Sequence, residues 1–283
     1  MNKIIVLLSV IAFLGCTDSK VNHTSKVKYL ERLSTFETKL IRKGPAPQDW
    51  VKEMPPKGVK EVFYESDSLA LKAWFYMPQT EKKAVPALVY FHGGFAFGSD
   101  DFFACKPFID AGFAVMCPML RGENGNPGNF ELLMGEVRDA IASVYWVASQ
   151  KGINTNQIYC FGHSSGGMLS ALVSLHEGVP VAMSGSAGGL YGIEFFDYWP
   201  ELVPFKTSDI AEKQLRLLVG NIADMKTTHI AYVGKDDKYQ AVSQAEKEKD
   251  TSSRLEIVFI EGDHFTSLVP SEHDFLSKVI SRF

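Results

Sequence analysis

Short apolar runs that alternate with stretches of helical periodicity constrain the fold of this chain most strongly. From Val85 onward the alternation indicates buried parallel strands joined by crossover helices. We expect strands at Ala87–Phe91, Phe113–Pro118, Gln157–Phe161, Pro180–Met183, His229–Val233 and Leu255–Ile260. We expect helices at Asp101–Ala111, Phe130–Ser149, Ser165–Leu175 and Ser271–Arg282. The pattern therefore predicts an α/β protein with a mostly parallel central sheet and helices on both faces.

The residues before Val85 do not show this alternation of strand and helix patterns. Apolar residues at helical spacing predict a helix over Ser25–Ile41. Two β-rich runs, Val59–Tyr64 and Leu69–Met77, flank a polar turn and predict a hairpin. We therefore divide the chain into an N-terminal helical extension at 27–58 and one large domain at 59–283.

A long aromatic segment, Leu190–Asp224, separates two of the predicted strands. It is too long for a simple connection between a strand and the next element. Its aromatic residues are Tyr191, Phe195, Phe196, Tyr198 and Trp199. The segment is either a small cap over the site or a structural pair of helices.

The first residues of the chain resemble an export signal. Lys3 precedes the apolar run Ile4–Leu14, which is too short to span roughly 30 Å of hydrocarbon at about 1.5 Å per residue. The run ends at Phe13-Leu14-Gly15-Cys16, which resembles a bacterial lipobox with Phe13 where leucine is usual. We predict a signal peptide at 1–15 and lipidation of Cys16, with ordinary cleavage and no lipid as the alternative.

This prediction places the protein outside the cytoplasm. The polar residues at 16–26 would be a tether, and the protein would be anchored by lipid in a bacterial cell envelope. Without the lipid it would be periplasmic or secreted.

Composition excludes several classes of partner. The formal net charge is −4, with 46% hydrophobic and 22% charged residues, so neither nucleic acid nor an anionic membrane surface is expected as a partner. Contact with a membrane would occur only through the N-terminal lipid. No metal or organic cofactor is implied, and the sequence does not indicate an oligomeric state.

Three cysteines remain after the predicted cleavage. Cys117 and Cys160 lie in apolar strand-like runs, where a free cysteine behaves as a small buried hydrophobe. The spacing matches no metal site, and a bridge between Cys105 and Cys117 is the alternative to free thiols.

The pentapeptide Gly162-His163-Ser164-Ser165-Gly166 fits the pattern G-x-S-x-G. It follows a predicted strand and opens a helix rich in small residues, as a nucleophile elbow requires. The glycines leave room for a strained turn and a closely packed helix. We therefore predict Ser164 as the nucleophile. Ser165, which stands on the helix, is the rival, and a glycine-rich turn without a catalytic role is the structural alternative.

A serine hydroxyl needs a base to remove its proton, and in such folds the order along the chain is nucleophile, acid, histidine. Gly234-Lys235-Asp236-Asp237 and Glu261-Gly262-Asp263-His264 follow two successive predicted strands. The C-terminal ends of parallel strands meet at one edge of a sheet. We predict His264 as the base and Asp237, third after Gly234, as its partner. Asp236 is the alternative, and Asp263 is expected in a turn or at the surface.

The attacked carbonyl oxygen becomes negatively charged and needs hydrogen-bond donors. We predict the backbone N–H of Ser165, at the start of the helix, as the first donor. The loop His92-Gly93-Gly94-Phe95 follows a predicted strand, and its glycines allow close backbone approach, so we predict Gly94 as the second donor. The alternative is a glycine turn with no such role.

With these motifs in place, the chain resembles the catalytic domain of the prolyl oligopeptidase family of serine hydrolases, from about Val59 to Phe283. The matching elements follow in order: His92-Gly93-Gly94-Phe95, Ala111 to Val115, Arg121-Gly122, Asp139 with Trp146, Gly162 to Gly167, Gly234 to Asp237, and His264. The resemblance implies an α/β-hydrolase fold and the triad Ser164, Asp237 and His264.

The chain departs from that family in two respects. Family members usually carry a large β-propeller that screens substrates by size, whereas about 60 residues precede the match here. Prolyl oligopeptidases proper use a tyrosine hydroxyl in the oxyanion hole, where this chain has His92. The donor then shifts to the loop backbone, as in HGG-type esterases. Arg121 and Glu123 would form a loop ion pair or bind a charged substrate group, and Asp139 would brace its helix.

These features predict a serine hydrolase that cleaves esters, amides or small peptides through an acyl-enzyme. A carboxylesterase without peptidase activity is one alternative. A non-catalytic binding protein on a hydrolase scaffold is the alternative from another class.

Overall fold

The computed structural model describes residues 27–282. The predicted signal peptide at 1–15, the tether at 16–26 and the lipidation site Cys16 lie outside the described residues. Within the described part, no helix has the length and apolar character needed to cross a membrane.

One mixed sheet organises the described chain, and its strands lie in the order β1-β2-β4-β3-β5-β6-β7-β8. From β4 through β8 in this order every neighbouring pair is parallel, whereas β1 and β2 are antiparallel to their neighbours. The strands are β1 (Val59–Ser66), β2 (Leu69–Tyr76), β3 (Val85–Phe91), β4 (Ala114–Pro118), β5 (Ile153–His163), β6 (Met183–Ala187), β7 (His229–Gly234) and β8 (Leu255–Ile260). The predicted hairpin is confirmed as β1 and β2.

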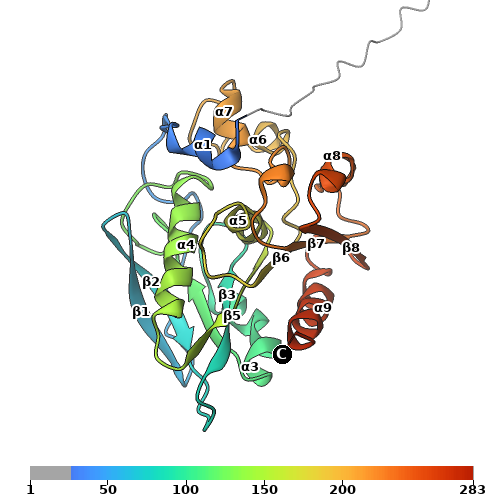
Figure 1. Cartoon of the computed structure of the whole chain (residues 1–283). Coiled ribbons are helices and arrows are strands. Elements are labelled where there is room, and N and C mark those ends of the chain that lie inside the picture. The colour runs from blue at the N-terminus through green and yellow to red at the C-terminus, as the bar shows by residue number, and fades with distance from the viewer. Residues whose placement is uncertain (1–26, 283) are drawn as a thin grey trace, which may run out of the picture.

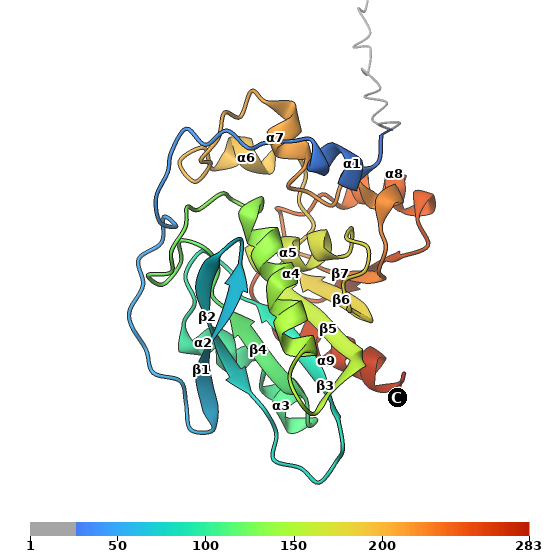
Figure 2. The same ribbon diagram turned by 60° about the vertical axis from the view of Figure 1, so that its left-hand side comes forward.

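Helices cover both faces of the sheet (Figures 1 and 2). α4 (Gly135–Ala148) and α5 (Ser165–Val173) pack on β3 and β5, and α3 (Lys106–Asp110) and α9 (Leu268–Ile280) lie on the opposite face. The remaining helices are α1 (Tyr29–Ser34), α2 (Ser99–Ala104), α6 (Phe195–Tyr198), α7 (Ile210–Gln214), α8 (Val242–Glu248) and the short 3₁₀ turns at Ile222–Asp224 and Lys249–Thr251. Each face has its own hydrophobic cluster. The predicted mostly parallel sheet with helices on both faces is confirmed.

The prediction for β6 was wrong in position. The predicted run Pro180–Met183 overlaps the strand only at its last residue, because the strand is Met183–Ala187. After Met183 this strand consists of serine, glycine and alanine residues. Large side chains pack closely at Gly185, where a Cβ would lie 2.7 Å from the Phe275 ring. The buried hydroxyls of Ser184 and Ser186 are satisfied by His229, at 2.8 Å and 2.9 Å. Such a strand gives no apolar signal in the sequence.

Two predicted helices differ from the observed ones, one in its first residue and the other in its continuity. The helix predicted from Phe130 begins only at Gly135, because Leu132 and Leu133 have positive φ angles of 50° and 73°. The helix predicted over Asp101–Ala111 is broken at Cys105 into α2 and α3, and Pro107 stands at the start of the second piece.

The N-terminal extension contains one short helix and is otherwise irregular. The predicted helix over Ser25–Ile41 is reduced to α1, and Leu40 forms an isolated β-bridge with Phe205. The Lys39 N–H donates to the Glu212 carboxylate at 2.7 Å, and the Ile41 N–H donates to the Pro204 carbonyl at 2.7 Å. Backbone groups that a helix would satisfy are thus satisfied by a distant segment.

That distant segment is the long connection at 190–224, which contains α6 and α7. Together with α1 it forms a layer beyond the end of α5 (Figures 1 and 2). Most of it packs against the N-terminal extension, as a structural helix pair would, but its first residues line the candidate site described below.

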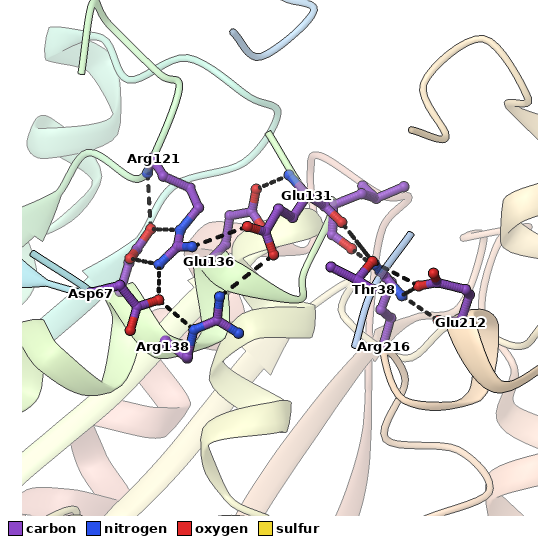
Figure 3. Close-up of polar contacts among 10 residues, drawn as sticks. Thr38, Asp67, Arg121, Glu131, Glu136, Arg138, Glu212 and Arg216 are labelled. Carbon is purple, nitrogen blue, oxygen red and sulfur yellow. Dashed lines mark hydrogen bonds and ion pairs between the residues drawn. The ribbon is translucent and has the colours of Figure 1, made fainter. Parts of the chain in front are cut away.

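Two buried arginines link segments that are distant in the sequence (Figure 3). The Arg121 guanidinium donates to both carboxylate oxygens of Asp139, at 2.9 Å and 2.7 Å, and also to Glu131 at 3.1 Å. Arg216 donates to Glu212 at 2.6 Å and to the Thr38 hydroxyl at 2.8 Å. Asp139 therefore braces the loop after β4 against its own helix, α4.

The three cysteines among the described residues are buried free thiols. The Sγ atoms of Cys105 and Cys117 lie 3.7 Å apart and are not bonded, and Cys160 is buried in β5. The described structure therefore has no Cys105–Cys117 bridge.

Candidate active site

The turn between β5 and α5 holds Ser164 in a strained conformation. Its φ is 54° and its ψ is −120°, which a residue other than glycine rarely adopts. The strain persists because strand and helix approach closely. A Cβ on Gly162 would collide with the backbone of Gly166, and a Cβ on Gly166 would collide with the Phe91 carbonyl. Only glycine fits at both positions, and the turn presents the Ser164 hydroxyl at the start of α5.

Three loops from different strands bring Ser164, His264 and Asp237 together. The Ser164 Oγ lies 3.0 Å from His264 Nε2, and His264 Nδ1 lies 2.7 Å from Asp237 Oδ2. Because a carboxylate only accepts, His264 donates from Nδ1 and its Nε2 is left as the acceptor for the Ser164 hydroxyl. This chain of hydrogen bonds can transfer the Ser164 proton to the imidazole.

The surroundings of Asp237 keep it ionised. Burial favours the neutral acid, but hydrogen bonds from His264, from the Tyr239 N–H at 3.0 Å and from the Gln240 amide at 2.7 Å outweigh it. The pKa of Asp237 is therefore below its usual value. Asp236 is exposed, and Asp263 accepts hydrogen bonds within its own turn, so neither carboxylate contacts the His264 ring.

The elbow itself also holds the His264 loop. His163 Nε2 donates to the backbone carbonyl of His264 at 2.7 Å, and burial lowers the pKa of His163 so that it stays neutral. Gly188 also packs closely against the His264 imidazole, because a Cβ at this position would lie 2.8 Å from the ring. The role of His163 could not be recognised from the sequence, because its position in the motif accepts many residue types.

The loop after β3 lies beside the start of α5. Ser165 is the first residue of that helix, so its N–H has no acceptor within the helix. The Ser165 hydroxyl donates to the Gly94 carbonyl at 2.6 Å. Ser165, the alternative nucleophile, therefore holds the loop. On the far side of the same peptide, the Phe95 N–H donates to Gln48 Oε1 at 2.8 Å. The Gly94–Phe95 peptide is therefore fixed from both sides, by α5 and by the N-terminal extension.

A buried ion pair holds the first residue of the loop after β3, His92. His92 Nε2 lies 3.0 Å from Glu123 Oε2, and the same carboxylate accepts the Leu120 N–H at 2.8 Å. Burial alone would lower the pKa of His92, but Glu123 outweighs it and raises that pKa to about 9. Arg121 and Glu123 are thus both buried in ion pairs, though not with each other, and neither is available to bind a charged substrate.

Aromatic rings surround the imidazole of His264. Tyr191, Phe195, Trp199 and Tyr239 form a continuous series with centroids 4.9–5.2 Å apart, and both ends of the series contact His264. Phe265 contacts the imidazole at 5.2 Å and is 73% exposed. The segment at 190–224 therefore supplies one wall of the site. Among residues 27–282, no group of three or more histidine, cysteine or carboxylate side chains could hold a metal ion.

Comparisons with known proteins agree with this architecture. A family model described as BD-FAE matches residues 75–187, which include the loop at Gly94 and the elbow at Ser164. Among solved structures, an esterase of Pyrococcus furiosus has a TM-score of 0.65 at 16% identity and covers 87% of this chain and 99% of its own. A puromycin-hydrolyzing peptidase of Mycobacterium tuberculosis has a TM-score of 0.67 at 16% identity, covering 81% of this chain and 40% of its own. The chain has the α/β-hydrolase fold.

Curated relatives match over shorter stretches. The uncharacterized peptidase YtmA of Bacillus subtilis is 25% identical over 150 residues, which are 53% of this chain and 56% of that protein. Kynurenine formamidase of Danio rerio is 30% identical over 102 residues, or 35% of this chain and 32% of that protein. The matches thus span about half or less of these relatives. None of these comparisons singles out the prolyl oligopeptidase family.

The His92–Glu123 pair predicts a pH-dependent stability. A histidine whose pKa is raised by folding contributes stability that is complete below about 6.5 and is lost as the pH rises through about 9. We expect the wild type to exceed His92→Gln in free energy of unfolding, and the difference to shrink by roughly 1–3 kcal/mol between pH 6 and pH 10. Urea unfolding of both proteins across this range measures it. A difference that does not change with pH would mean that His92 is neutral in the folded protein.

Proposed function

We propose that this protein is a serine hydrolase that cleaves small esters or amides through an acyl-enzyme. The observation that carries the proposal is the hydrogen-bonded series from Ser164 through His264 to Asp237, with distances of 3.0 Å and 2.7 Å. The three residues come from loops after β5, β8 and β7, and the only chemistry that this arrangement serves directly is activation of the serine hydroxyl.

In the proposed reaction, the Ser164 Oγ attacks the substrate carbonyl carbon while His264 Nε2 takes the hydroxyl proton. The N–H groups of Ser165 and Gly94 donate to the oxygen that becomes negative. His264 then passes the proton to the leaving group as its bond to carbon breaks, and Asp237 stabilises the imidazolium in between. Water, deprotonated by His264, attacks the acyl-enzyme and frees Ser164.

The loop after β3 does not discriminate between esters and amides in this proposal. His92 has no hydroxyl, and its Nε2 is paired with Glu123, so the donors to the oxyanion are backbone groups in this proposal. The similar proteins include esterases, peptidases and a formamidase by name, so a carboxylesterase and a small-peptide hydrolase are both compatible. A non-catalytic binding protein is less well supported, because binding alone would not require Ser164, His264 and Asp237 to lie within hydrogen-bond distance of one another.

Removal of the nucleophile gives the first test. We expect Ser164→Ala to abolish labelling by a fluorophosphonate probe, because Ser164 carries the serine hydroxyl that His264 contacts, at 3.0 Å. The Tyr191 hydroxyl, 3.4 Å from the same nitrogen, belongs to a buried phenol whose pKa is raised. The melting temperature should change by no more than a few degrees. Ser165→Ala is the matched variant, and it should still be labelled. Labelling of Ser164→Ala at the level of the wild type would contradict the assignment.

The acid can be tested against its neighbour in sequence. We expect Asp237→Asn to lower kcat on the order of 10⁴-fold, because an amide no longer holds His264 in the tautomer that accepts from Ser164. Asp236→Asn removes the same charge from an exposed site and should change kcat less than about threefold. Steady-state hydrolysis of p-nitrophenyl acetate measures both. A larger loss from Asp236→Asn would exchange the two roles.

We further propose that the protein is exported and that Cys16 carries a lipid. The support is the apolar run Ile4–Leu14 followed by the lipobox-like residues Phe13 to Cys16. Mass spectrometry of the mature protein from a bacterial envelope should find an acyl-glyceryl adduct on an N-terminal Cys16, which Cys16→Ser should lack. A free amino terminus at another residue would exclude lipidation.

A further inference from the structure

The hydroxyl of Tyr191 lies against both atoms between which the catalytic proton moves. Its oxygen is 3.5 Å from the Ser164 Oγ and 3.4 Å from His264 Nε2. The proposed mechanism does not use this hydroxyl. A buried phenol in contact with the nucleophile and the base therefore needs an explanation of its own.

Tyr191 is held in place by the same loop that carries the triad acid. The Gln240 amide donates to Asp237 Oδ2 at 2.7 Å, and its oxygen accepts the Leu190 N–H at 3.2 Å. The Ala241 N–H also donates to the Leu190 carbonyl at 2.8 Å. The backbone that precedes Tyr191 is thus fixed to the Asp237 loop, and the ring is buried against Phe195, with centroids 4.9 Å apart.

The hydroxyl keeps its proton under all conditions in which the triad works. Burial raises the pKa of Tyr191 well above its usual value, and the negative charge of Asp237 adds to the effect. Tyr191 is therefore a neutral hydrogen-bond donor and not a second base.

The position of the hydroxyl identifies the substrate atom that it can reach. In acylation, the leaving-group atom must lie beside His264 Nε2, because it receives the proton from that nitrogen. An atom in that place is also within reach of a hydroxyl that lies 3.4 Å from the same nitrogen. The oxyanion, by contrast, points toward the N–H of Ser165 and does not contact the imidazole.

We propose that the Tyr191 hydroxyl donates a hydrogen bond to the leaving-group oxygen or nitrogen as its bond to the acyl carbon breaks. The inference rests on the proposed function and adds a catalytic residue to it. The bond from Ser164 Oγ to carbon forms, the bond from carbon to the leaving group breaks, and His264 moves the serine proton to the leaving group. Tyr191 keeps its own proton and stabilises the negative charge that builds up before the transfer is complete.

This role predicts a specific dependence on the leaving group. A good leaving group such as p-nitrophenoxide needs little help, whereas an alkoxide carries more charge and gains more from a donor. For acetate esters of p-nitrophenol, phenol, trifluoroethanol and ethanol, the acyl group is constant and kcat/KM reports acylation. We expect Tyr191→Phe to lose about 10- to 100-fold on ethyl acetate and less than about threefold on p-nitrophenyl acetate.

Tyr239→Phe is the matched control. Both tyrosine rings contact His264 at nearly the same distance, 6.3 Å for Tyr191 and 6.2 Å for Tyr239, but only the Tyr191 hydroxyl contacts the triad atoms. Any change that Tyr239→Phe makes to the rate should affect all four esters alike. The plot of log kcat/KM against leaving-group pKa should therefore become steeper only for Tyr191→Phe.

An equal loss on all four esters, or no loss, would overturn the proposal and assign Tyr191 a packing role. If Tyr191→Phe fails to fold, 3-fluorotyrosine in place of Tyr191 keeps the ring and strengthens the donor, and the plot should then become shallower. An unchanged slope with the fluorinated residue would also overturn the proposal. Failure of the proposed function is distinguishable, because wild-type protein would then neither react with a fluorophosphonate nor hydrolyse any of the esters.

Discussion

The close approach of backbone to backbone at Gly162 and Gly166 is the constraint on which the rest of the structure depends. It lets α5 begin directly beside the end of β5 and against the Phe91 carbonyl of β3. Ser164, between strand and helix, then has no alternative to its strained φ of 54°. The packing of three elements thus sets the direction of one hydroxyl, and the cost of the strain is met by the surrounding sheet.

The other two members of the triad stand on loops, where position must come from cross-links. The His264 loop is tied to the elbow by His163, and the Asp237 loop is tied by Gln240 to the backbone before Tyr191. Each cross-link joins segments that follow different strands. The imidazole can therefore keep its distances of 3.0 Å and 2.7 Å although no helix or strand holds it directly.

The sequence predicts what is local and fails where distant contacts decide. The parallel sheet follows from apolar periodicity, and the loops at Ser164, Asp237 and His264 follow from the order of motifs after strands. β6 was misplaced because buried hydroxyls that bond His229 look polar in the sequence. The N-terminal helix was overestimated because Glu212 and Pro204, more than 150 residues away, satisfy its backbone. No local pattern could have indicated that Gln48 reaches Phe95 or that the Tyr191 hydroxyl reaches His264.

The residues proposed for catalysis and the residues that line the site come from different parts of the chain. The groups proposed to activate the nucleophile belong to loops that directly follow β7 and β8. The surfaces around them come from elsewhere: Gln48 from the N-terminal extension, and Tyr191, Phe195 and Trp199 from the segment between β6 and β7. Those two segments bond to each other through Lys39, Ile41 and Glu212. The second segment also contacts the triad through the Tyr191 hydroxyl. Substitutions at Phe195 or Trp199, whose rings line the site, can reshape its wall without removing a hydrogen bond to the nucleophile. A fold of this kind can change its substrate while keeping its reaction.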